Sequence, residues 1–205
     1  SEDELHGDTG NDTIIGGEDT DWLYGGDGDD VLDGYLLTGG SDDQTYGSDS
    51  TDYYVGGAGN DTLYGNSHDD SYYFNLGDGN DVIIEGAFYL SGYWYYSYSD
   101  TLIFGSGITA NSIKASKLNN DLVITVTATD TVTIKNWFSD YKLQLESFRF
   151  ADGSTLTAAE ISQMVNTLRG TAGDDVLTLG TSADGVLYGE GGNDVLTGGS
   201  GNDAI

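Results

Sequence analysis

The chain has 205 residues, of which 35 are acidic and 6 are basic, and its formal net charge is −29. This balance excludes nucleic acid as a partner and disfavours an anionic membrane surface, because both need clustered lysine and arginine. Since the hydrophobic share is 37%, a packed core is possible, and the acidic residues then require cations as partners rather than solvent alone.

The charge is unevenly distributed along the chain. Residues 1–113 and 170–205 contain no lysine or arginine, whereas residues 86–169 carry seven acidic and six basic residues. We therefore expect three domains: an acidic repeat array over residues 1–85, a nearly neutral β-rich segment over 86–169, and a second repeat array over 170–205.

A nine-residue pattern begins near the N-terminus and runs to residue 84, with short inserts near 34–37 and 74–75. Residues 7–15 read GDTGNDTII and residues 25–33 read GGDGDDVLD. An aspartate occupies the sixth position of each unit, and Asp3 stands nine residues before the first of them. The candidate metal ligands of this array are Asp3, Asp12, Asp21, Asp30, Asp43, Asp52, Asp61, Asp70 and Asp81.

The pattern predicts a turn that holds a metal ion. Glycine allows positive φ and lets carbonyl oxygens converge, while the sixth-position aspartate adds a hard carboxylate oxygen. Such oxygens at a flexible site suit Ca²⁺ better than Mg²⁺, which demands a small octahedron. The carbonyls expected to contribute are those of Gly10, Gly17, Gly26, Gly28, Gly57, Gly59 and Gly79.

Positions seven to nine of each unit predict a short strand whose eighth side chain points inward. These inward residues are Leu5, Ile14, Leu23, Leu32, Thr45, Tyr54, Leu63, Tyr72, Ile83, Leu177, Leu187, Leu196 and Ile205. Two units would form one coil of an all-β, right-handed parallel β-roll, so turns 18 residues apart stack with Ca²⁺ between them. Asp12 then shares an edge with Asp30, and Asp52 shares one with Asp70.

The middle segment predicts strands at about 101–104, 113–118, 121–127, 131–135 and 144–150, from alternation and β-branched content. Thr157 to Glu160 has the form of a capping box, which predicts a helix that runs to about Leu168, stops at Gly170 and covers the apolar end of a roll.

An aromatic insert precedes these strands at residues 86–99, GAFYLSGYWYYSYS. One interpretation is a hairpin whose rings pack on the sheet. The other is a patch formed by Tyr93, Trp94 and Tyr95 that contacts a carbohydrate or a protein partner.

The second array begins at residue 170 and contains GTAGDDVLT (170–178) and GEGGNDVLT (189–197). Its candidate metal ligands are Asp175, Asp194 and Asp203, with the carbonyls of Gly173, Gly199 and Gly201. Gly185 stands at the sixth position of another unit, so we expect that unit to bind weakly or not at all. Since both chain ends cut a repeat, we expect the natural protein to be longer.

The GGxGxDxUx units resemble the RTX (repeats-in-toxin) family, whose β-roll binds Ca²⁺. Residues 72–168 resemble a haemolysin-type calcium-binding-related domain found between RTX arrays, through YYFNLGDGNDVIIE (72–85), DTLIFGSGI (100–108), DLVITV (121–126), VTIKNWF (132–138) and FRFADG (148–153). The resemblance implies several bound Ca²⁺ ions and an extracellular bacterial location. It also implies export through type I secretion machinery as part of a larger toxin, enzyme or adhesin. Two alternatives stay open: the C-terminal region of a secreted protease or lipase, and a ligand-binding or extender segment of an adhesin.

Several kinds of chemistry are absent from the sequence. The chain has no cysteine, which excludes disulfides and thiolate zinc sites, and it has neither an H-E-x-x-H nor a G-x-S-x-G motif. No apolar run approaches the length of about 18 residues that predicts a transmembrane segment. Paired carboxylates could imitate a glycosidase dyad, but their nine-residue phase favours calcium. We therefore expect no catalytic residues and no enzymatic activity.

Overall fold

The structure is a computed structural model that describes residues 1–34, 51–65, 68–86, 88–90, 93–95, 99–179 and 185–205. Its contacts divide the chain into two compact units, Ser1–Ala158 and Ala159–Ile205. Within the first unit, strands from before and after residue 86 pair with each other, so this unit extends beyond the expected first array. The three-domain organisation stays a prediction.

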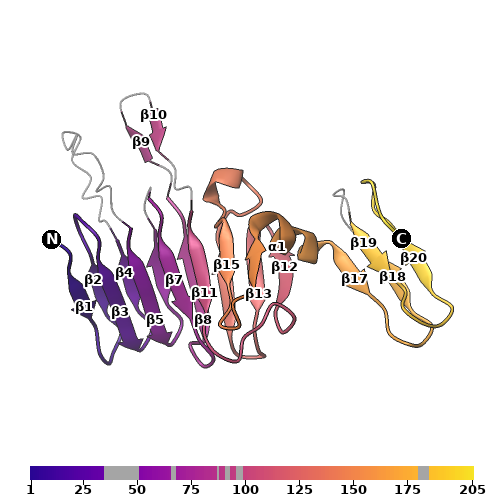
Figure 1. Ribbon diagram of the computed structural model, residues 1–205, viewed down its shortest axis with the longest axis horizontal. Helices are drawn as coiled ribbons and strands as arrows, with labels where there is room; N and C mark the ends of the chain where they lie inside the picture. The colour runs from indigo at the N-terminus through magenta and orange to yellow at the C-terminus, as the bar shows by residue number, and fades with distance from the viewer. Residues whose placement is uncertain (35–50, 66–67, 87, 91–92, 96–98, 180–184) are drawn as a thin grey trace. The chain divides into compact units, whose positions relative to one another are not determined.

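The first unit is a roll formed by two sheets of seven strands each (Figure 1). The first sheet, sheet A, runs β1 (Glu4–His6), β3 (Trp22–Asp27), β5 (Tyr53–Ala58), β7 (Ser71–Phe74), β11 (Thr101–Phe104), β15 (Ser147–Arg149), β16 (Thr155–Thr157). The second, sheet B, runs β2 (Thr13–Ile15), β4 (Val31–Asp33), β6 (Thr62–Tyr64), β8 (Asn80–Ile84), β14 (Thr131–Ile134), β13 (Asp121–Thr125), β12 (Lys114–Leu118). Because successive repeat strands alternate between the sheets, neighbouring repeat strands within each sheet are parallel, which confirms the predicted parallel β-roll.

The eighth-position side chains form the core of the roll. Leu23, Tyr54 and Tyr72 are fully buried and stand in register on neighbouring strands of sheet A. Leu32 and Leu63 do the same in sheet B. The prediction was wrong for Ile205, which is 73% exposed at the end of the second unit. Thr45 lies outside the described residues.

The middle segment continues both sheets and then closes them. Strands β11 and β15 extend sheet A in parallel, and β16 ends it in antiparallel pairing. Strand β14 extends sheet B in parallel, followed by the antiparallel strands β13 and β12. All five expected strands are confirmed within a few residues, with Trp137 and Phe148 fully buried beneath them. A short 3-10 helix covers Tyr141–Leu143.

The aromatic insert contains strands β9 (Phe88–Leu90) and β10 (Tyr93–Tyr95), which pair in antiparallel register as the hairpin interpretation predicts. The side chains of Tyr93, Trp94 and Tyr95 lie outside the described part of the chain. Their role as a ligand patch therefore stays a prediction.

The helix α1 covers Ala158–Val165, so the expected end at Leu168 was wrong. Thr167–Arg169 instead forms strand β17, in which Leu168 pairs with Leu187 of β19 (Val186–Tyr188). The Val186 N–H donates to the Asn166 carbonyl. The residues at the end of the expected helix therefore form a strand that pairs with a repeat strand. The capping role of the helix stays a prediction.

The second unit contains two small parallel sheets. One pairs β17 with β19, and the other pairs β18 (Val176–Thr178) with β20 (Val195–Thr197). The eighth-position residue Leu187 is 2% exposed, whereas Leu177 and Leu196 are half-buried.

Candidate metal centre

The sixth-position aspartates form two hydrogen-bonded ladders along the roll. In each ladder the backbone N–H of one aspartate donates to Oδ1 of the aspartate in the next coil, at N···O distances of 2.8–3.0 Å. The ladder that precedes the strands of sheet A contains Asp3, Asp21, Asp52, Asp70 and Asp100. The ladder that precedes the strands of sheet B contains Asp12, Asp30, Asp61 and Asp81.

The ladders show which turns stack. Asp12 bonds to Asp30 and Asp52 to Asp70 across 18 residues, as the repeat length predicts. The step from Asp21 to Asp52 is 31 residues, because the chain between these coils is longer than two units. Asp43 falls within that longer segment and lies outside the described residues.

Some of the ladder carboxylates are buried and incompletely partnered. Asp21, Asp30 and Asp61 are each 0% exposed. Within the described part of the chain, the Oδ2 atoms of these three residues and of Asp12 are buried without a hydrogen-bond partner. A buried carboxylate oxygen without a partner is strongly unfavourable unless a cation neutralises it. Hard carboxylate oxygens in such turns suit Ca²⁺, so the residues fit the predicted ion.

The glycine at the first position of several units creates the space around Oδ2. A Cβ at Gly7 would lie 2.8 Å from Oδ2 of Asp12, and one at Gly16 would lie 2.7 Å from Oδ2 of Asp21. Any side chain at these two positions would therefore collide with the carboxylate. The repeat pattern thus reserves room for the aspartate and for a ligand beside it.

The turn glycines of the first array have the backbone conformation that the sequence predicts. Gly10, Gly17, Gly26, Gly28 and Gly57 all have positive φ, between 100° and 138°. A side chain on Gly28 or Gly57 would meet the carbonyl of the glycine in the adjacent coil, so these turns stack backbone against backbone. Positive φ does not occur at Gly173, Gly199 or Gly201 of the second array.

Two of the predicted carbonyl ligands already accept hydrogen bonds. The Gly59 carbonyl accepts from the Asn80 N–H at 3.2 Å, and the Gly79 carbonyl accepts from the Thr131 N–H at 2.8 Å. A carbonyl oxygen has two lone pairs, so each retains one for a metal. Their role as ligands stays a prediction.

Burial and repulsion raise the pKa of three ladder aspartates, Asp21, Asp61 and Asp81. Burial raises the pKa of Asp61 to about 6, with further repulsion from Asp30, Asp78 and Asp29. Burial raises the pKa of Asp81 to about 8, and the neighbouring charges of Asp61 and Asp78 add to it. Ionising these carboxylates in the folded ladder is therefore unfavourable without a cation, and a bound cation would reduce that free-energy cost.

The sequence analysis missed two acidic residues that continue the first ladder. Asp70 N–H donates to Asp100 Oδ1 at 2.8 Å, and Asp100 N–H donates to Glu146 Oε2 at 2.9 Å. Both precede a strand of sheet A, in D-T-L-I (100–103) and E-S-F-R (146–149). Most nine-residue units also end with an acid, any residue, an apolar residue and any residue. This pattern is present at both places in the sequence, but neither place continues the nine-residue spacing.

The second unit contains the same kind of hydrogen bond between stacked turns, in shorter ladders. Asp175 N–H donates to Asp194 Oδ1 at 3.0 Å, and Gly185 N–H donates to Asp203 Oδ1 at 3.1 Å. Gly185 occupies a ladder position without a carboxylate, as its sequence predicts. The Asp175 Oδ2 accepts the Thr171 N–H at 2.6 Å. The carbonyl roles of Gly173, Gly199 and Gly201 stay predictions.

A parallel β-roll whose turns stack buried aspartates defines a class of protein, the calcium-binding solenoids. The chain matches the RTX calcium-binding nonapeptide repeat family in four copies, at residues 6–37, 46–83, 163–186 and 180–205. It belongs to this family, and it binds Ca²⁺ at several repeats. Residues 121–160 match the haemolysin-type calcium binding protein related domain, a shorter span than the expected 72–168. A comparison with curated proteins found no match.

In the part of the chain that the structure describes, no helix has the length and apolar character needed to cross a membrane.

Proposed function

We propose that this chain is the module through which a larger secreted bacterial protein folds when it meets extracellular Ca²⁺. The observation that carries the proposal is the pair of ladders, in which buried aspartates stack with an oxygen that has no hydrogen-bond partner. We assign the ions to the sixth-position aspartates, from Asp3 to Asp81 in the first array and Asp175, Asp194 and Asp203 in the second. The turn carbonyls complete these sites.

The switch follows from charge and chain entropy. Without the ion, carboxylates in adjacent coils repel one another, and the 32 glycines lose much conformational entropy on folding. An ion that binds only the folded state shifts the equilibrium toward folding. Extracellular calcium modules have dissociation constants on the order of 10⁻⁴–10⁻³ M, so the sites would fill outside the cell and stay free of Ca²⁺ in the cytosol.

The family resemblance supports a role in export. A chain that stays unfolded in the cytosol can pass a type I secretion channel, and folding outside would prevent its return. The parent protein would be a toxin, an enzyme or an adhesin, and this segment would support it without carrying its catalytic residues. Ligand contact through the aromatic hairpin would favour an adhesin.

The test is circular dichroism of the chain during a Ca²⁺ titration, with Mg²⁺ as the control. We expect a cooperative gain of β signal with Ca²⁺ and little change with Mg²⁺, because Mg²⁺ requires a smaller octahedral site. Equal β content in chelator and in Ca²⁺ would contradict the switch, although the fold would stand.

A further inference from the structure

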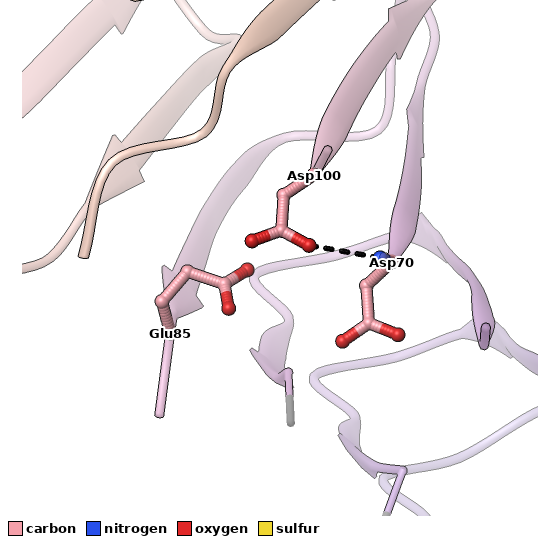
Figure 2. Close-up of side chains that lie close together, drawn as sticks. All are labelled: Asp70, Glu85 and Asp100. Carbon is pink, nitrogen blue, oxygen red and sulfur yellow. Dashed lines mark hydrogen bonds between the residues drawn. The ribbon is translucent and has the colours of Figure 1, made fainter. Parts of the chain in front are cut away.

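Three buried carboxylates, two of them members of the first ladder, meet near the end of that ladder, and together they differ from a repeat site. Asp70, Glu85 and Asp100 are 1%, 8% and 2% exposed. Each offers a carboxylate oxygen that lies within 4.8 Å of those of the other two. Figure 2 shows the three side chains pointing toward a common space between their backbones.

Both sheets supply this cluster. Asp70 and Asp100 immediately precede β7 and β11, which are parallel neighbours in sheet A. Glu85 immediately follows β8 of sheet B, where the Gly65 N–H donates to the Ile84 carbonyl. A Cβ at Gly65 would lie 2.8 Å from Glu85 Oε2, so the carboxylate of Glu85 packs directly against this glycine of the preceding coil.

Glu85 therefore stands one coil beyond Gly65, at the place that the repeats reserve for their first glycine. Elsewhere that glycine leaves space for one aspartate oxygen, as Gly7 does for Asp12. Here the Glu85 carboxylate and the Tyr72 hydroxyl fill that space at Gly65. The arrangement is the reverse of what repulsion would favour, since the chain adds an acid where two acids are already buried.

The part of the sequence that supplies the cluster contains neither lysine nor arginine. Residues 1–113 contain no lysine or arginine. The Tyr72 hydroxyl donates to Glu85 Oε1, but a neutral donor cannot neutralise three carboxylates. Burial, and then the charges of Asp100 and Asp70, raise the pKa of Glu85 well above its usual value.

An independent observation points to a ligand at the same place. The Tyr54 hydroxyl is fully buried and has no hydrogen-bond partner among the described residues. Its ring stacks on that of Tyr72, with centroids 4.9 Å apart, and the two residues are in register on β5 and β7. The charges of Asp70, Asp52 and Glu85 act on the Tyr54 hydroxyl, which places it near two members of the cluster. A buried hydroxyl normally has a partner, and a metal-bound water would supply one.

We propose that Asp70, Glu85 and Asp100 form a separate Ca²⁺ site, held by three carboxylates at the junction between the repeats and the middle segment. It shares Asp70 and Asp100 with the first ladder, differs from the repeat sites in having three carboxylates, and does not depend on a role in export. Because calcium affinity rises with the number of charged ligands, this site binds Ca²⁺ at least tenfold more tightly than a repeat turn.

The test is equilibrium Ca²⁺ binding by the whole 205-residue chain, with Ca²⁺ alone as the probe. The wild-type chain should show one tight ion followed by a weaker class. Glu85→Gln should lose the tight ion and keep the weaker class. Glu2→Gln removes the same charge from an exposed residue and should keep both.

Four results are distinguishable. Unchanged binding by Glu85→Gln would refute this site alone, and loss of every ion would assign Glu85 to the repeat sites and also refute it. If Glu85→Gln does not fold, Asp100→Asn, which retains an oxygen to accept the Asp70 N–H, must lose the same single ion. No Ca²⁺ binding by the wild-type chain would overturn both this site and the proposed function.

Discussion

Replacing Asp61 by asparagine should have opposite effects with and without calcium. Asp61 is fully buried in the middle of the second ladder, where its Oδ1 accepts the Asp30 N–H at 2.8 Å and its Oδ2 has no partner. Asparagine keeps the accepting oxygen and removes the charge. The substitution therefore keeps the hydrogen bond that holds adjacent coils together and removes the charge that binds the ion.

The structure gives the size of both effects. The pKa of Asp61 rises from 3.8 to about 6 in the metal-free fold, which corresponds to about 3 kcal/mol of unfavourable free energy when the group is ionised. Asp61→Asn removes this term in chelator. In Ca²⁺ at 100 times the dissociation constant, losing one ion removes about 2.7 kcal/mol of stabilisation.

The assay is circular dichroism in chelator, combined with urea unfolding in saturating Ca²⁺. We expect Asp61→Asn to be at least as folded as the wild type in chelator above pH 7 and less resistant to urea in Ca²⁺. The matched control is Asp29→Asn, which removes one charge from an exposed residue of the adjacent turn while keeping the acceptor for Asn60. If Asp61→Asn were less folded in chelator but gained as much from Ca²⁺ as the wild type, Asp61 would be a structural residue alone.

Two further perturbations test the same sites. The pKa values of Asp61 and Asp81 in the metal-free fold are about 6 and about 8, above the 3.8 of the unfolded chain. The folded state therefore binds more protons, and its stability in chelator should fall as the pH rises from about 4 to about 8. Ca²⁺ displaces these protons, so its affinity should rise between about pH 5 and about pH 8; a flat profile in Ca²⁺ titrations would contradict the assignment. Gly25→Ala places a Cβ against Asp30 Oδ2 and the Gly56 carbonyl, and should cost about 1–3 kcal/mol in urea unfolding and weaken one Ca²⁺ site. Gly191→Ala, whose nearest contact is 3.5 Å away and whose φ is not positive, should change neither; equal losses in both variants would show that the space around Oδ2 is not specific.

The nine-residue period was sufficient to predict the roll, because it fixes both the inward residue and the acid of each turn. It correctly stacked Asp12 on Asp30, since a coil of two units returns the chain to the same edge. It missed Asp100, because the insert at residues 86–99 interrupts the count although the D-T-L-I pattern resumes directly after it. It extended the helix to Leu168, because the apolar spacing there fits either a helix or a strand, and only pairing with Leu187 decides between them.

The position of Glu85 beside Asp70 and Asp100 cannot be predicted from a local sequence pattern. In sequence it ends an apolar strand, and it is separated by 15 residues from both Asp70 and Asp100. Its place beside them depends on β8 and β11 belonging to opposite sheets of one roll and on Gly65 leaving the space. Glu85 lies close to Asp70 and Asp100 because the chain completes a coil of the roll between them. The position of that coil depends on the length of every insert that precedes it.

Asp21, Asp30 and Asp61 use their two oxygens for different purposes, and this couples metal binding to folding. Oδ1 accepts a backbone N–H from the adjacent coil and so fixes the register of the stack. Oδ2 lies in the space left by glycine and needs a cation. The charge that opposes folding is thus on the same side chain as the bond that holds adjacent coils. Because each coil contacts only its neighbours, neutralising one turn favours order in the next. In the proposed function, calcium therefore acts on the step that builds the solenoid, rather than on a fold that has already formed.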